Sequence, residues 1–149
     1  MHNKNTIPDE LNNALGFNIY RTALLYKREL IQALSDYELT PEQWQTLAVL
    51  WLGEDPRSQG EIAELTMRDK HSVSRLIARM EQNGWVTRFA HAKDKRITMI
   101  KPTKKANESR EEIVKALQLH FVPINSVLTK EENVTLLELL KKLRGYLED

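Results

Sequence analysis

Basic side chains gather in one part of this 149-residue chain. Between Arg68 and Lys105 there are eleven Lys and Arg residues and only three acids, a net charge of +8. The whole chain carries +1, so the remainder carries −7. Ammonium and guanidinium groups bind phosphate oxygens, and the guanidinium group also matches the edge of guanine. A basic segment within an acidic remainder is therefore typical of a nucleic-acid-binding module.

The periodicity of apolar residues predicts a helix over residues 69–83. Asp69 is its expected N-cap, and Asn83-Gly84 is its expected left-handed stop. Four apolar residues fall on one face of this helix and should be buried: Val73, Leu76, Ile77 and Met80. The opposite face should then be free to enter the major groove of DNA, where the first half of a recognition helix contacts the bases.

Polar residues on and around that helix are the candidate DNA ligands. Ser74 and Arg75 are the first candidates for contacts with base edges, where Arg75 can bind guanine with two hydrogen bonds. His71 and Lys70 are the next candidates for the same contacts. Ser72, with the N–H groups of the helix start, can instead hold a phosphate. The full set is Gln59 and Arg68 for backbone contacts, together with Lys70, His71, Ser72, Ser74, Arg75 and Arg79. The alternative hypothesis is a solvated amphipathic face that binds nothing.

Two strand-like runs, 85–89 and 96–101, follow the helix and predict a β-hairpin wing. Its charged tip, 91–96, can reach the minor groove, where narrow A·T-rich segments attract arginine. Asp94 precedes Arg96 by two residues, so on an extended strand both side chains point to the same side and Asp94 can hold the guanidinium group. The wing candidates are Lys93, Asp94, Lys95 and Arg96. The alternative is a mobile, solvated turn.

The remaining elements must position this module. Capping boxes predict helix starts at Thr40, Ser58 and Thr129, and Glu54-Asp55-Pro56 is an expected turn. A helix from Asp9 to about Ser35 carries two apolar stripes, one for the core and one for a second subunit; the alternative is a helix wholly buried in a monomer.

A long helix should run from Pro102-Thr103 to about His120, with Pro123 interrupting it. The last helix carries a leucine seam, which predicts a dimerisation element: Leu136, Leu140, Leu143 and Leu147.

Several classes of function find no support in the sequence. There is no cysteine, which excludes disulfides and thiol chemistry. The histidines at 2, 71, 91 and 120 are scattered, so no metal site is expected, and no glycine-rich loop or nucleophile motif suggests a cofactor or an enzyme.

The chain lacks a signal peptide or an apolar run that could span a bilayer, so we expect a cytoplasmic protein. The large aromatic residues are expected in the core, and the alternative is that they line a ligand pocket: Trp44, Trp51, Trp85, Tyr20 and Tyr26.

The order of these elements resembles the MarR family of winged-helix transcriptional regulators. The resemblance covers nearly the whole chain, and its most specific parts are Ser72-Val73-Ser74-Arg75-Leu76, the run from Met80 to Arg88, and Asp94-Lys95-Arg96, which looks like the family's Asp-x-Arg wing motif. Lys101-Pro102-Thr103 departs from the family's leucine-threonine helix start, and Asn107 replaces a later glycine.

The resemblance implies a mainly α fold with a small β-hairpin wing. It implies a winged helix-turn-helix DNA-binding domain (37–102) and dimerisation helices (9–36 and 103–149). The polar composition of residues 1–8, which end in Pro8, predicts a disordered tail. The resemblance also implies a homodimeric regulator on palindromic double-stranded DNA, with 69–83 in the major groove and Arg96 in the minor groove, controlled by a small lipophilic or phenolic effector. Repression is the simpler expectation, because a bound dimer blocks a promoter. The absence of cysteine excludes the peroxide-sensing branch. The alternative is a winged-helix protein-interaction module.

Overall fold

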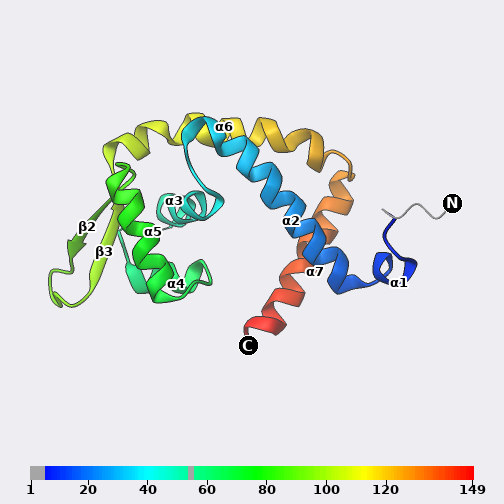
Figure 1. Ribbon diagram of the computed structural model, residues 1–149, viewed down its shortest axis with the longest axis horizontal. Coiled ribbons are helices and arrows are strands. Elements are labelled where there is room, and N and C mark those ends of the chain that lie inside the picture. The colour runs from blue at the N-terminus through cyan, green and yellow to red at the C-terminus, as the bar shows by residue number, and fades with distance from the viewer. Residues whose placement is uncertain (1–5, 54–55) are drawn as a thin grey trace. The chain divides into compact units, whose positions relative to one another are not determined.

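The computed structural model describes residues 6–53 and 56–149, which are mainly helical with one small antiparallel sheet (Figure 1). The elements are α1 (Asp9–Asn12), α2 (Leu15–Leu34), the 3-10 helix η1 (Ser35–Tyr37), α3 (Pro41–Leu52), β1 (Arg57–Ser58), α4 (Gln59–Leu65), α5 (Lys70–Gln82), β2 (Val86–Ala90), β3 (Thr98–Pro102), α6 (Lys104–Asn125) and α7 (Lys130–Glu148). This order confirms the predicted fold class, mainly α with a small β-hairpin wing.

The chain divides into two compact units, Met1–Arg110 and Glu111–Asp149, and α6 runs through the boundary. Two sequence-based predictions fall partly outside the described residues: Glu54 and Asp55 of the expected turn, and residues 1–5 of the expected tail. No helix in the described part of the chain is long and apolar enough to cross a membrane.

The predicted helix starts are confirmed. Thr40, Ser58 and Thr129 each form a complete capping box, in which the hydroxyl accepts from the backbone N–H three residues ahead and that residue's side chain accepts from the cap's own N–H. Asp69 caps α5 and accepts from the Ser72 N–H at 2.9 Å. These caps use groups within four residues of one another, and for this reason the sequence alone locates them.

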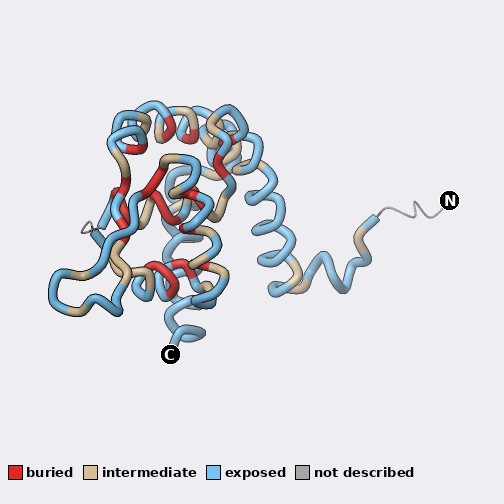
Figure 2. The backbone as a smooth tube through the Cα atoms, turned by 60° about the vertical axis from the view of Figure 1, so that its left-hand side comes forward, coloured by how far each residue is buried: buried red, intermediate tan, exposed pale blue. Residues whose placement is uncertain are grey.

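The core of the first unit is built around the inner face of α5, whose Val73, Ile77 and Met80 are fully buried. Ile62 from α4 and Ile100 from β3 are also fully buried. Buried segments are concentrated in this part of the chain, whereas α2 is exposed along most of its length (Figure 2). Trp51 and Trp85 belong to the core as predicted. The same prediction is wrong for Tyr20 and Tyr26, which are exposed on α2.

Two helix predictions need correction. The expected helix from Asp9 to about Ser35 is broken at Asn13–Ala14. The Asn18 side chain donates to the carbonyls of Asn12 and Ala14, both at 2.8 Å, and so satisfies backbone groups that a continuous helix would pair internally. Pro123 does not interrupt α6, which continues to Asn125. Proline lacks the N–H that would pair with the carbonyl four residues back, but only two residues of the helix follow Pro123.

The strands lie one or two residues later than predicted, and a third strand was missed. β2 pairs with β3 from Val86↔Pro102 to Ala90↔Thr98, and β1 pairs with the other edge of β3 through Arg57↔Ile100. β1 has only two residues, too few to show an alternating pattern. It nevertheless attaches the start of α4 to the wing.

The apolar stripes of α2 are not covered in the monomer. Leu34 is the one buried residue that α2 contributes, so the interpretation of a helix wholly buried in a monomer is wrong. The predicted leucine seam of α7 is exposed as well. The exposed residues are Leu15, Ile19, Leu24, Leu25 and Ile31 on α2, and Leu136, Leu140, Leu143 and Leu147 on α7. Contiguous apolar patches of this kind usually mark an interface with another protein.

Candidate nucleic-acid interface

The burial of one face of α5 determines which residues the helix presents to solvent. Lys70, His71, Arg75 and Arg79 are exposed, and Ser72 and Ser74 are half-buried. Leu76, predicted to be buried, is half-buried. The candidate DNA ligands of α5 therefore lie on its outer side. A rigid helix with this distribution can place its basic side chains in a major groove without disturbing the core.

The first turn of α5 already holds an anionic group. The carboxylate of Asp69 accepts from the Ser72 N–H at 2.9 Å and from the Ser72 hydroxyl at 2.7 Å. The Ser72 hydroxyl and N–H lower the pKa of Asp69, so the carboxylate is charged at neutral pH. Both donors of Ser72 are thus taken by Asp69, and a phosphate placed at Ser72 would also meet a like charge.

A shallow groove of about 340 Å³ brings together candidates from three elements. Gln59 comes from the start of α4, Lys70 from the start of α5 and Arg96 from the wing. The remaining lining residues are small or apolar: Ser58, Gly60, Ile97 and Thr98. Two cations and an amide at one groove supply positive charge and hydrogen-bond donors, which suit the phosphodiester backbone of DNA. Lys93 and Lys95 do not line it and are exposed at the wing tip.

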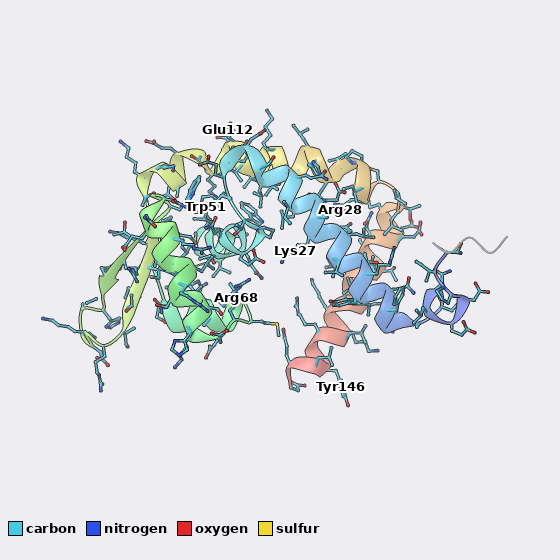
Figure 3. All side chains as sticks on the ribbon, viewed as in Figure 1. Lys27, Arg28, Trp51, Arg68, Glu112 and Tyr146 are labelled. Atoms are coloured by element: carbon cyan, nitrogen blue, oxygen red, sulfur yellow. The ribbon has the colours of Figure 1, made fainter. Side chains whose placement is uncertain are left out.

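A second hollow, of about 400 Å³, lies on the other side of α5. Arg68, Arg75 and Arg79 line it together with Glu42. Glu42 binds the Lys27 ammonium at 2.9 Å and the Arg68 guanidinium at 3.4 Å; Figure 3 labels both of these cations. The hydrogen bond from Lys27 lowers the pKa of Glu42, with a smaller contribution from the charge of Arg68. Arg68 is therefore anchored to Glu42 within the protein. Its predicted role was a contact with the DNA backbone beside α5.

The wing contains the predicted contact between Asp94 and Arg96. The guanidinium donates to the carboxylate through Nε at 3.0 Å and Nη2 at 3.1 Å, and the Arg96 backbone N–H donates to the same carboxylate at 3.1 Å. The side-chain hydrogen bond from Arg96 lowers the pKa of Asp94. The partners are as predicted, but the reason given was wrong: both residues lie in a turn before β3, not on an extended strand.

The side chain of Arg96 is 91% exposed although its position is fixed. Asp94 binds one edge of the guanidinium group, and the other N–H groups remain directed outward. In Figure 1 the loop that carries this residue projects from the end of the hairpin formed by β2 and β3. A guanidinium group held in place before binding loses less entropy when it enters a groove.

A contact between Glu81 and Arg88 was missed at the sequence level. The carboxylate of Glu81, in the last turn of α5, accepts from the Arg88 N–H at 3.0 Å and from its guanidinium at 3.2 and 3.1 Å. Arg88 lies on β2, so this contact joins the recognition helix to the wing. The only signal in the sequence was the presence of both residues in the run from Met80 to Arg88. Their pairing depends on the turn at Gly84, where φ is +80°.

The end of α5 is also fixed by the start of α6. The Thr103 hydroxyl donates to the Gly84 carbonyl at 2.6 Å, and the Lys105 ammonium donates to the Asn83 carbonyl at 3.0 Å. The same ammonium lies 4.4 Å from the centre of the Trp85 ring. These contacts satisfy carbonyl groups at the C-terminus of α5, where a positive charge is favourable.

Known proteins share this arrangement. The model of the MarR family matches residues 37–97. The uncharacterized HTH-type transcriptional regulator YwoH of Bacillus subtilis is 34% identical over 104 residues, which cover 69% of this chain and 74% of that protein. The chain belongs to the MarR family.

Solved structures of MarR-family proteins agree with this fold. A MarR mutant from E. coli complexed with operator DNA superimposes with a TM-score of 0.81 at 26% identity, covering 87% of this chain and 92% of that one. Reduced AbfR bound to DNA gives a TM-score of 0.74 at 26% identity, covering 94% and 96%. The repressor CouR bound to a DNA duplex gives a TM-score of 0.87 at 21% identity, covering 93% of this chain and 98% of that one. At this level of identity the similarity shows the fold alone. Within the described residues, no cluster of His, Asp and Glu could hold a metal ion.

The contact between Glu81 and Arg88 predicts a pH dependence for this MarR-family fold. Hydrogen bonds from the Arg88 backbone and side chain lower the pKa of Glu81. A carboxyl group whose pKa is lowered stabilises the fold above its ordinary pKa, and this contribution disappears as the pH falls through the lowered value. We expect Glu81→Gln to be less stable than the parent at about pH 7, and the difference to shrink between about pH 5 and pH 3.

Denaturant unfolding at several pH values measures this difference. Glu64→Gln, at an exposed position on α4, is the matched control. Its difference in stability from the parent should not change comparably with pH. If the loss of unfolding free energy in Glu81→Gln stays constant as the pH falls, the ion pair is not what holds the wing to α5.

Proposed function

We propose that this chain is a homodimeric, sequence-specific DNA-binding transcriptional regulator. One observation carries the proposal: the buried face of α5 leaves Lys70, His71 and Arg75 exposed, next to a wing in which Asp94 holds the exposed guanidinium of Arg96. An α-helix fits the major groove, and an arginine on a wing fits the minor groove beside it. In the proposed complex, Ser74 and Arg75 contact base edges, and Gln59, Lys70 and the wing lysines contact the backbone.

The proposed dimer supplies the symmetry of the site. The exposed apolar residues of α2 and α7 are the surface that a second copy would cover. Residues 9–36 and 103–149 would then form the dimerisation region, and 37–102 the DNA-binding domain. Two recognition helices about 34–36 Å apart contact successive major grooves on one side of the duplex. The operator should therefore be an inverted repeat.

Repression is the simplest consequence of binding such a site, because a dimer on a promoter blocks access to it. The relative YwoH is bacterial, and a bacterial regulator meets its DNA in the cytoplasm, so we propose a cytoplasmic location. Release by a small lipophilic or phenolic effector remains a prediction from the family resemblance. Selection of bound DNA with and without small phenolic compounds tests it.

Two arginine substitutions test the assignment of the grooves. Selection of bound sequences from a random pool should yield an inverted repeat with the parent protein. Arg75→Ala should relax the base preference at one position in each half-site, by about 1–3 kcal/mol of discrimination. Arg96→Ala should weaken binding and reduce the preference for A·T pairs at the flanks of the site.

Lys115→Ala is the control, because it removes one exposed positive charge outside the basic segment. It should leave both preferences unchanged. Recovery of no symmetric motif with the parent would contradict the proposed function, whereas parent-like motifs from both arginine variants would contradict only the residue assignments.

Salt dependence separates DNA binding from the alternative, a winged-helix module that binds a protein partner. A protein that neutralises several phosphates releases counterions, so we expect affinity for the selected operator to fall about a thousandfold or more between ~50 and ~200 mM salt. Fluorescence anisotropy with labelled duplex measures the slope. A shallow slope at both specific and random DNA would favour the protein-interaction module.

The dimer surface on α7 can be tested without disturbing the buried core. Leu140 and Leu143 are exposed in the monomer, so replacing both with Gln should leave the fold intact and shift the protein from dimer to monomer. Sedimentation velocity at low micromolar concentration measures the change. Lys142→Gln, also at an exposed position of α7, should remain dimeric. A double variant that sediments like the parent would place the dimer interface elsewhere.

A further inference from the structure

His91 occupies the point where β2 ends and the wing tip begins. Its Nδ1 accepts hydrogen bonds from the backbone N–H groups of Lys93 at 3.1 Å and Asp94 at 3.3 Å. The backbone N–H of His91 donates to the Ile97 carbonyl at 3.0 Å and closes the base of the loop. A side-chain acceptor that binds the N–H groups two and three residues ahead is the turn motif that Asn and Asp usually form. Here an imidazole nitrogen takes that place.

This motif is connected directly to the arginine of the wing. His91 binds the N–H of Asp94, and the carbonyl of Asp94 accepts from the Ile97 N–H at 3.0 Å. Both backbone groups of Asp94 are therefore fixed. The carboxylate of Asp94 in turn binds the backbone and the guanidinium of Arg96. The loop thus consists of two consecutive turns, and the first of them determines where the second one starts.

The two hydrogen bonds specify one chemical form of the ring. Nδ1 accepts only when it carries no proton, so the imidazole must be neutral with its proton on Nε2. Protonation of Nδ1 would make it a donor directed at two N–H groups, and both bonds would be lost. The charged groups around His91 are those of the tip itself: Lys93, Asp94, Lys95 and Arg96. The strand residues that close the loop, Ala90, Ile97 and Thr98, carry no charge.

We propose that His91 is a positioning residue of the wing: its neutral Nε2–H tautomer orders the tip and so places the guanidinium of Arg96 for the minor groove. The inference rests on the proposed function, in which Arg96 enters that groove. His91 itself need not touch DNA. An asparagine can replace it, because its Oδ1 is attached to Cγ as Nδ1 is and accepts in the same turn motif.

The first experiment compares affinities for two operators that share the selected half-sites and differ in A·T or G·C flanks. The affinity that Arg96→Ala loses defines the contribution of the wing to binding. His91→Ala should bind the A·T operator roughly 2- to 10-fold more weakly than the parent, the equivalent of about one hydrogen bond. It should bind the G·C operator almost as the parent does. His91→Asn should restore the parent's ratio.

Nuclear magnetic resonance of the ¹⁵N-labelled free protein decides the inference independently of DNA. At about pH 8 the ring of His91 should show the Nε2–H tautomer, with an unprotonated Nδ1. The backbone signals of Lys93, Asp94 and Arg96 should shift in His91→Ala and return toward the parent's positions in His91→Asn.

The outcomes separate the two hypotheses. If Arg96→Ala matters but His91→Ala binds like the parent, or if Asn fails to rescue, the role of His91 is disproved and the proposed function stands. If Arg96→Ala binds both operators like the parent, the proposed use of the wing fails. An Nδ1–H tautomer at about pH 8 would overturn the positioning role in either case.

Discussion

The orientation of α5 about its own axis is the constraint on which the rest of the interface depends. Val73, Ile77 and Met80 are fully buried, and together they leave the helix one orientation in the core. Because a helix is rigid, burying one face determines which side chains point outward. Lys70 and Arg75 are exposed for this reason alone. The binding chemistry of the surface is thus a consequence of apolar packing on the opposite side of the same helix.

The wing depends on α5 through short polar contacts. Glu81 holds Arg88 at the start of the hairpin, Thr103 holds the Gly84 carbonyl, and Asp94 holds Arg96 at the tip. Exposed ion pairs add only modestly to folding stability. Their larger contribution is geometric, since they keep the hairpin and its arginine at a fixed position relative to the recognition helix. A binding site arranged before the ligand arrives loses less free energy to ordering.

Glu42 extends this chain of contacts to α2. It binds Lys27 on α2 and Arg68 in the loop before α5, so one carboxylate connects the helix with the exposed apolar stripes to the start of the recognition helix. The Arg68 side chain therefore serves the protein's internal geometry in the free state, as well as the backbone contact predicted for it.

The sequence by itself determined what depends on neighbours within a few residues. Helix caps at Thr40, Ser58 and Asp69 follow from local spacing, as do three of the four residues predicted for the buried stripe of α5, and the structure has each of them. Tertiary structure decided what joins distant segments: Glu42 with Lys27, β1 beside β3, and the exposure of α2. The physical reason is that periodicity records which face of an element is apolar, but not which element covers that face. Even the correct pairing of Asp94 with Arg96 arises from a turn whose shape depends on His91, and no strand pattern contains that information.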